Sequence, residues 1–367
     1  VYDRTALTRR ITTTAAALGP HTELLYALKA NPHPDILTAA AQHTDGIDVA
    51  SEGELTDALA AKPRRVVFGG PAKTDNALSL AVTADVPVTI NVESVHELRR
   101  LDLIARRHHR VAPIALRINR ATGTLTGSHR MTGTPTPFGI DESQLSQAIA
   151  LTTQSPGVRL TGLHLHSVSN NLDAAAHVAF VADSLAYAAL IADEHRLTFD
   201  TVNVGGGIGV DPTGAAAFDL DEFSRLLPEA DMSGPRVVYE LGRYLTAEIG
   251  WYAAEVIDIK HTHDRTFAVL RGGTHHFRLP AAWGYSHPAT VIEREDWPYP
   301  WPRPELVNAT VDVTGELCTP RDVLARGLHV DRLRIGDILV FDRCGAYGWT
   351  ISHHDFLNHP HPTFIVL

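Results

Sequence analysis

Short apolar, β-branched runs alternate with amphipathic or alanine-rich stretches from residue 24 to about residue 245. The apolar runs are LLYALK, GIDVA, RRVVFGG, VPVTINV, PIALRIN, LTGLHLHSV, FDTVNVGGG and PRVVYELG. Stretches such as SEGELTDALAA and VESVHELRRLDLIARRH have the spacing of helices. Strands and helices in this alternation predict a parallel (β/α)8 barrel. A doubly wound open sheet is the competing fold, but it seldom needs so many units in series.

The pattern changes after about residue 250, where helical periodicity fades. GWYAAEVIDIK, TFAVLRG, ATVDVTG and DILVFD predict short strands, and REDWPYPWPRP predicts an irregular loop. The opening segment VYDRTALTRRITTTAAAL predicts a short strand and a helix that leads into the barrel. We therefore predict an α/β plus β protein. Its barrel covers residues 20–245, and residues 1–19 and 246–367 form a mostly β domain of the sandwich or barrel type.

Composition narrows the function classes. Hydrophobic content of 44% and charged content of 20% over 367 residues are ordinary for a globular protein, and the net charge of -10 argues against nucleic-acid binding. We expect no membrane span, because no apolar run approaches the length needed to cross a bilayer. Cys318 and Cys344 are too few for a disulfide framework, which favours a reducing, cytoplasmic location. The chain begins at Val1, so the sequence leaves open whether a targeting segment precedes it. The 21 histidines show no zinc-site spacing, so we expect no metal.

Polar residues stand at the ends of the predicted barrel strands. Lys29 ends the first strand, and the other strand ends carry Asp48, Arg117, His166, glycines 205–207, Glu240 and Arg243. These ends converge at the mouth of a barrel, where active sites lie. A buried ammonium is costly unless it is paired or chemically changed, and the alternative for Lys29 is a side chain that reaches solvent.

GGGIG at 205–209 directly follows the apolar VNV. Glycines there let backbone N–H groups close around an anion, although a plain turn has the same composition. Arg243 would add a cation to that anion. Glu240 needs a donor, and a protonated ring nitrogen would supply one. A lysine, a phosphate cradle and a carboxylate aimed at a ring nitrogen indicate a pyridoxal phosphate site, with Lys29 joined to the aldehyde as a Schiff base.

Together these motifs resemble the fold-type III pyridoxal phosphate decarboxylases, the group of diaminopimelate and ornithine decarboxylases, over nearly the whole chain. YALKAN matches the lysine strand, HLHSVSNN the His-x-Gly-Ser segment and YELGR the Glu-Pro-Gly-Arg motif. The resemblance implies a barrel of the alanine-racemase type with pyridoxal 5'-phosphate as cofactor. It implies that His166 stacks on the pyridine ring, and that Asp48 and Glu54 fall near the lysine. The implied cofactor-binding residues are Lys29, Asp48, Arg117, His166, Ser169, Gly205, Gly206, Gly207, Glu240, Gly242, Arg243 and Tyr347.

The β domain carries two further family motifs. GELC supplies the catalytic acid as Cys318, and CGAYG supplies a phosphate-binding tyrosine as Tyr347. In this family the cysteine segment reaches across a dimer interface, so the resemblance implies a homodimer with two composite sites. An inert buried thiol is the alternative for Cys318.

Departures from the family pattern bear on the substrate. Val168 replaces a glycine and Leu241 a proline, and both changes look tolerable. Thr319 follows the cysteine where diamine-handling relatives carry an acidic residue. A hydroxyl cannot neutralise an ammonium, which disfavours ornithine, lysine and meso-diaminopimelate.

FRLPAAW resembles the family's Arg-Pro-x-x-Tyr region, with Trp283 near the place of the tyrosine and Arg278 as a carboxylate clamp. SNNLDAAAHV, GGTHHFRLP and FLNHPHP resemble the subgroup of carboxylate-type siderophore assembly. Its members decarboxylate an amino acid already joined to a citrate-like unit, or supply a diamine building block. Arg271 would add a counter-charge, and the alternative for these residues is a solvated loop. The implied substrate-binding residues are Arg243, Arg278, His275, His276, Thr319 and Asp322.

The most favoured function is decarboxylation of a citryl-type amino acid in siderophore biosynthesis. A diaminopimelate- or ornithine-type decarboxylase, an amino-acid racemase and a non-catalytic cofactor-binding protein are the alternatives. Glu240 would keep the ring nitrogen protonated and strengthen the electron sink, which disfavours a racemase that needs a weak one. GELC and GAYG argue against a binding protein built from the barrel alone.

Overall fold

The computed structural model describes residues 1–121, 125, 127, 129–130, 132–228 and 232–367. The chain forms two compact units. One consists of residues 6–211 and 216–245, and the other of residues 1–5, 212–215 and 246–367. Residues 6–19 therefore belong with the barrel, not with the β domain where the sequence placed them. The reason is that helix α1 (Arg4–Leu18) buries Leu7, Ile11 and Leu18 within the first unit.

The first unit is a closed parallel barrel. Its strands, among the described residues, are β1 (Thr22–Ala27), β2 (Gly46–Val49), β3 (Val66–Phe68), β4 (Val88–Val92), β5 (Ala112–Asn119), β8 (Val158–His164), β10 (Thr201–Gly205) and β11 (Arg236–Leu241). They pair in the order β4-β3-β2-β1-β11-β10-β8-β5, and the additional pairing of β4 with β5 closes the ring. All of these pairings are parallel. The predicted barrel is confirmed, and an open sheet is excluded because the ring has no edge.

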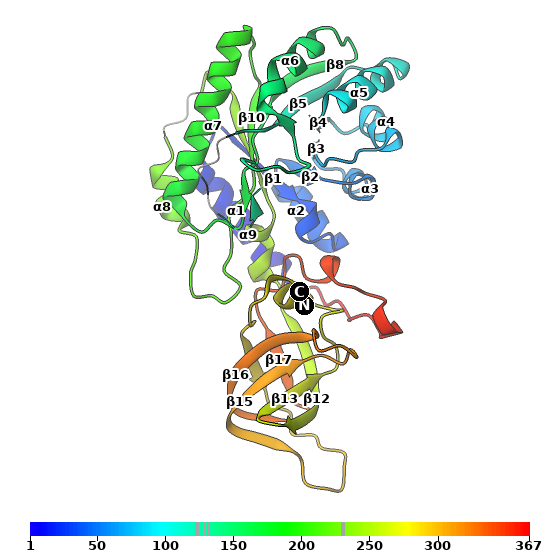
Figure 1. The fold of residues 1–367 in the computed structure, drawn as a ribbon, viewed down its shortest axis with the longest axis vertical. Coiled ribbons are helices and arrows are strands. Elements are labelled where there is room, and N and C mark those ends of the chain that lie inside the picture. The colour runs from blue at the N-terminus through cyan, green and yellow to red at the C-terminus, as the bar shows by residue number, and fades with distance from the viewer. Residues whose placement is uncertain (122–124, 126, 128, 131, 229–231) are drawn as a thin grey trace. The chain divides into compact units, whose positions relative to one another are not determined.

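Helices lie outside the strands, as Figure 1 shows. They are α2 (Pro34–His43), α3 (Glu52–Ala60), α4 (Asp75–Thr83), α5 (Val95–Arg107), α6 (Leu145–Thr153), α7 (Ala174–His195), α8 (Leu220–Leu226) and α9 (Arg243–Thr246). Several begin where a polar side chain accepts the N–H of the third residue along. Ser51, Thr74, Ser94 and Asp173 do so for α3, α4, α5 and α7. Short strands β6 (His129–Arg130) and β9 (Val168–Ser169) pair with each other, and β7 (Ile140–Asp141) pairs with β5.

Helix α7 corrects one expectation from the sequence. With 22 residues and a mean hydropathy of 1.6, it is long and apolar enough to cross a membrane by length and composition. Its buried residues include Phe180, Val181, Ala188 and Ile191, so the helix covers the barrel with one face. An apolar covering helix explains this composition without a membrane.

The second unit is built around a mixed sheet. The strands are β12 (Tyr252–Thr262), β13 (Arg265–Leu270), β14 (Ala289–Ile292), β15 (Glu305–Thr314), β16 (Val323–Arg334) and β17 (Ile338–Phe341), in the order β14-β17-β12-β13-β15-β16. Helix α10 (Leu279–Trp283) follows β13, and the predicted loop at 294–304 forms neither helix nor strand. Phe277, Val313, Leu324 and Phe341 lie in the core. The predicted opening strand is an isolated bridge at Tyr2. The sequence missed β14 and β16, which are short or heavily charged.

Candidate active site

Lys29 and Asp48 form an ion pair at the mouth of the barrel. Strand β1 ends at Ala27, and Lys29 follows in a single 3-10 turn, so it lies just beyond the strand rather than in it. Its Nζ is 2.5 Å from Asp48 Oδ2. The Lys29 side chain is 45% exposed and the Asp48 side chain 4%. Burial, followed by the nearby charge of Glu240, raises the pKa of Asp48 to about 7, although Lys29 opposes the shift. The two buried carboxylates thus compete for one ammonium.

Glu240 lies near the end of β11 in a fully polar setting. Its Oε1 accepts hydrogen bonds from Asn203 Nδ2 at 2.6 Å and Asn91 Nδ2 at 3.3 Å. Its Oε2 lies 3.4 Å from His164 Nε2. Burial disfavours the charged form of Glu240, but His164, Lys29 and His166 outweigh it and hold the pKa of this carboxyl below its usual range. Glu240 is therefore an ionised carboxylate whose Oε2 faces the ring of His164.

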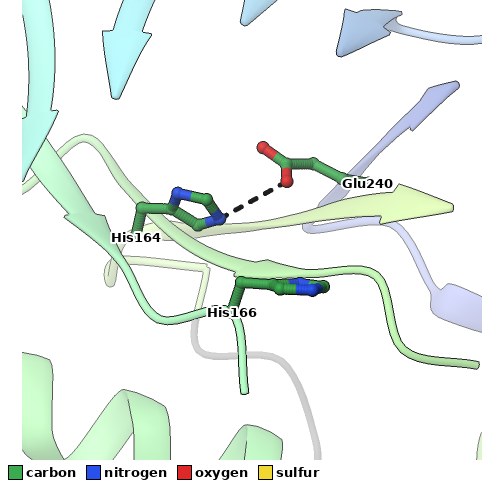
Figure 2. Close-up of side chains that lie close together, drawn as sticks. All are labelled: His164, His166 and Glu240. Carbon is green, nitrogen blue, oxygen red and sulfur yellow. Dashed lines mark ion pairs between the residues drawn. The ribbon is translucent and has the colours of Figure 1, made fainter. Parts of the chain in front are cut away.

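Two histidines complete this cluster. His164 ends β8 and His166 follows two residues later, and Figure 2 shows both rings beside Glu240. His164 is buried, and neither of its ring nitrogens has a hydrogen-bond partner among the described residues. His166 Nδ1 accepts the N–H of Gly206 at 3.1 Å. Desolvation, then Arg117, lowers the pKa of His166 well below its usual value, so the ring is neutral.

Glycines 205 and 206 lie close to His166 and to the backbone of Glu240. A Cβ on Gly205 would lie 2.1 Å from His166 Nδ1, and one on Gly206 would lie 2.4 Å from the Glu240 carbonyl oxygen. Gly205 and Gly207 also have φ values of 69° and 102°, which favour glycine. The sequence therefore needs glycine here both for backbone conformation and for the close approach of His166.

Other predicted cofactor residues have structural partners. The buried Arg117 guanidinium lies 2.9 Å from Glu93 Oε1 and 4.9 Å from the Phe138 ring centre. Gly242 lets the end of β11 pack against the lysine turn, because a Cβ there would lie 2.9 Å from the Ala30 Cβ. Arg243 opens α9 and is buried, and Ser169 lies half-buried in β9.

Glu54 has a local structural role. Its Oε2 accepts the N–H of Ala50 at 2.7 Å, while its own N–H donates to Ser51 Oγ at 3.1 Å. This reciprocal pair is a capping box that starts α3. Glu54 still adds negative charge near Asp48 and contributes to the raised pKa of that carboxyl.

In the second unit, Cys318 and Asp322 have opposite environments. Cys318 is exposed, which contradicts the inert buried thiol, and Thr319 beside it is half-buried. Asp322 is buried, and its oxygens accept the N–H groups of Thr274 at 2.7 Å and Leu317 at 2.8 Å. Through these two bonds Asp322 positions the loop that carries Cys318, and its role in substrate binding stays a prediction.

The remaining predicted substrate residues differ in whether their polar side-chain groups already have partners. His275 is fully buried, and its Nε2 lies 3.5 Å from Glu316 Oε1. His276 is engaged on both nitrogens, by Tyr252 Oη and the Pro360 carbonyl. Arg271 pairs with Glu255 at 3.0 Å. Arg278 is exposed, and its guanidinium has no ion-pair partner among the described residues. Tyr347 is half-buried with a φ of 51°.

Comparison with known proteins identifies the family. Residues 4–247 match the model of the pyridoxal-binding domain of pyridoxal-dependent decarboxylases. The chain belongs to this family. It is 40% identical to the 2-[(L-alanin-3-ylcarbamoyl)methyl]-2-hydroxybutanedioate decarboxylase of Staphylococcus aureus, over 100% of this chain and 93% of that protein.

Diaminopimelate decarboxylases are also similar to this chain, at lower sequence identity. The enzyme of Bacteroides thetaiotaomicron is 28% identical over 90% of this chain and 84% of its own. The crystal structure of a mutant of the Helicobacter pylori enzyme, complexed with L-lysine, superposes with a TM-score of 0.87 at 26% identity and covers 100% of this chain and 90% of that chain. Pyridoxal phosphate is thus the cofactor of this decarboxylase, as the sequence predicted.

The residues at the barrel mouth fit that cofactor. Lys29 supplies an amine for the aldehyde, and Glu240 presents its Oε2 for a ring nitrogen. Both nitrogens of the buried His164 and Oδ1 of the buried Asn91 lack hydrogen-bond partners among the described residues. Gly205 leaves only backbone at its position, because a side chain there would collide with His166. An aromatic ring with a phosphate and a protonated nitrogen answers each of these features.

Sequence reasoning missed Asn91, Asn203 and His164. All three lie within or at the end of barrel strands and are almost fully buried. An asparagine inside an apolar, β-branched run such as TVNVGGG is itself a signal, since a buried amide needs partners. His164 and His166 alternate in HLH, and this two-residue spacing places both on the same side of an extended chain.

Proposed function

We propose that this decarboxylase acts on an amino acid whose side chain carries a citrate-like unit, in the assembly of a carboxylate-type siderophore. The similar S. aureus protein is named for such a substrate, an alanine joined through its C3 amine to a hydroxy-tricarboxylic acid. The observation in this chain that carries the proposal is the exposed Arg278, which has no ion-pair partner in the described part of the chain, together with Thr319. A free guanidinium suits a carboxylate, whereas a hydroxyl beside Cys318 cannot neutralise a distal ammonium.

The cofactor would be held at the barrel mouth. Lys29 would bind its aldehyde carbon, Glu240 would face the ring nitrogen, and the backbone of glycines 205–207 would surround the phosphate. His166 would lie against the ring. When bound, pyridoxal phosphate accepts the electron pair that the substrate's α-carbon retains as carbon dioxide leaves.

The protein side chains manage charge and protons in this reaction. Glu240 would keep a proton on the ring nitrogen, because Asn91 and Asn203 fix its other oxygen and a carboxylate stabilises positive charge at short range. Asp48 would orient the Lys29 side chain through the contact between Asp48 Oδ2 and Lys29 Nζ. Cys318 Sγ would then deliver the proton that replaces carbon dioxide on the α-carbon. Arg278 would hold the distal carboxylates, whereas His275 is buried and both ring nitrogens of His276 already have partners.

Two further assignments belong to this proposal. We expect a homodimer in which the β domain contributes to both the dimer and the active site, because that arrangement goes with the family to which the chain belongs. We also expect the enzyme to work in the cytoplasm, where pyridoxal phosphate and reduced thiols are available.

The decisive experiment measures carbon dioxide release from a panel of amino acids. The panel contains the citryl amide of 2,3-diaminopropionate, ornithine, lysine and meso-diaminopimelate. We expect release from the citryl amide at least about tenfold faster than from any diamine amino acid, since an unneutralised buried ammonium costs more than about 1.4 kcal/mol. Faster release from meso-diaminopimelate would establish the diaminopimelate alternative. Deuterium uptake at the α-carbon with the carboxylate retained would establish a racemase.

A further inference from the structure

The cluster of His164, His166 and Glu240 has the donor set of a transition-metal site. One nitrogen from each ring and one carboxylate oxygen all lie within 4.8 Å of one another. Two imidazoles and one carboxylate suit zinc and similar borderline ions, which bind such atoms at about 2.0–2.2 Å. Ligand atoms around one ion are then at most about 4 Å apart. The present spread of up to 4.8 Å would therefore need ligand atoms to move by less than about an ångström to complete the site.

The surroundings favour a cation at this position. His164 is buried without a hydrogen-bond partner on either nitrogen among the described residues, and its Nε2 is directed at Glu240 Oε2 (Figure 2). Asn91 and Asn203 donate hydrogen bonds to the other oxygen of Glu240 and so fix the orientation of the carboxylate. Residues next to metal ligands commonly orient them in this way. A dication would satisfy the His164 nitrogen and Glu240 Oε2 at once.

We propose that, when pyridoxal phosphate is absent, His164, His166 and Glu240 bind a divalent transition-metal ion such as Zn2+ or Co2+, and that the bound ion blocks cofactor loading. The metal site follows from the geometry of these side chains alone. The block on loading also rests on the proposed position of the cofactor, because both would require Glu240 Oε2. The free chain would then be held inactive by metal until the ion is withdrawn.

The two histidines should contribute unequally. His166 Nδ1 already accepts the N–H of Gly206, so the proton of this neutral ring is on Nε2. Ligation through Nε2 moves that proton to Nδ1 and breaks the bond to Gly206. His164 gives up no hydrogen bond to the described residues when it binds a metal. Replacement of His164 should therefore weaken metal binding more than replacement of His166.

The test uses the full-length chain freed of cofactor and titrated with Co2+, whose visible absorption bands report ligation by nitrogen and oxygen. We expect bands that saturate at one ion per chain and that excess Zn2+ removes. In His164→Gln the affinity should fall at least about tenfold, because even loss of a group outside the ligand shell commonly costs that much. Glu240→Gln, which keeps the side-chain volume, should have the same effect. Circular dichroism checks that both variants are folded.

His275→Gln is the matched control. His275 is equally buried, has no hydrogen-bond partner on its ring nitrogens among the described residues, and lies 3.5 Å from a carboxylate oxygen of Glu316. His359 Nδ1 lies 3.7 Å from the same oxygen, but among the described residues no three donor atoms there all lie within 4.8 Å of one another. Its Co2+ bands should equal those of the unaltered chain. Bands that are absent, that persist in His164→Gln, or that disappear in His275→Gln would overturn the metal site.

A loading experiment tests the second part. The cofactor-free chain, with or without one equivalent of Zn2+, is mixed with pyridoxal phosphate, and growth of the cofactor's visible band is followed. We expect loading to slow at least about tenfold with Zn2+ and to recover when EDTA is added. Unchanged loading, with the Co2+ result intact, would overturn the block alone. Failure of metal-free protein to bind the cofactor would refute the proposed function and leave the metal site standing.

Discussion

The buried His177 allows a quantitative test of the packing around helix α7. This side chain of α7 is fully buried, and its ring lies 5.6–6.0 Å from the ring centres of Phe180, Phe218 and Phe223. Neither ring nitrogen has a hydrogen-bond partner among the described residues. Burial lowers the pKa of His177 from 6.5 to about 4. The folded chain therefore resists protonation that the unfolded chain accepts.

The sign and size of the effect follow from this difference. Because the unfolded chain binds the proton more tightly, the folded state loses stability as the pH falls through 6.5, and the loss is complete near pH 4. The full shift corresponds to about 3 kcal/mol, and the part between about pH 7.5 and about pH 5 to about 2 kcal/mol. His177→Leu removes the titrating group, so this share of the acid sensitivity should disappear. Near pH 7.5 the variant should be as stable as the unaltered chain or slightly more so, since an unpaired polar group is removed.

The assay is urea unfolding at several pH values, followed by far-ultraviolet circular dichroism. Tryptophan fluorescence would not serve, because all five tryptophans lie after residue 250 and therefore outside the barrel unit. Subtraction of the variant's free energy of unfolding from that of the unaltered chain cancels the other titrating groups. An equal pH dependence in both proteins would refute the reasoning and would mean that the folded chain admits water or a proton to this ring.

Further predictions concern the reaction. Lys29→Ala should abolish carbon dioxide release with an unchanged circular dichroism spectrum, and retained activity would reject Lys29 as the cofactor lysine. Cys318→Ala should slow turnover about a hundredfold or divert product while cofactor binding is kept, since proton transfer by a positioned acid contributes about that much; an unaltered rate and product profile would remove its role. Thr319→Glu should lower the rate with the citryl substrate at least about tenfold by like-charge repulsion, checked by kcat/KM. Gly205→Ala should weaken cofactor binding at least about tenfold, because the added Cβ would meet His166. Gly19 also has a positive φ, but a Cβ there would meet nothing within 4 Å, so Gly19→Ala should bind the cofactor normally. Absorbance titration with pyridoxal phosphate compares the two variants.

The sequence by itself determined the barrel and the identity of its mouth. Hydrophobic, β-branched runs at regular intervals specify strands through local periodicity, and parallel closure brings their carboxyl ends together. Lys29, Asp48, His166 and Glu240 could therefore be assigned to one site before any distance was known. The glycines at 205–207, directly after a buried strand, also indicated a special backbone conformation there, although a plain turn has the same composition.

Tertiary structure decided what each polar group does with its partners. Glu240 is held by Asn91 and Asn203, which lie 149 and 37 residues away along the chain, and no local pattern links them. Asp322, predicted as a substrate ligand beside Cys318, also accepts two backbone N–H groups, one of them 48 residues away. Helix α1 likewise joined the barrel instead of the β domain. Local periodicity encodes secondary structure, whereas hydrogen-bond partners and charge balance depend on which distant segments folding brings within about 3 Å.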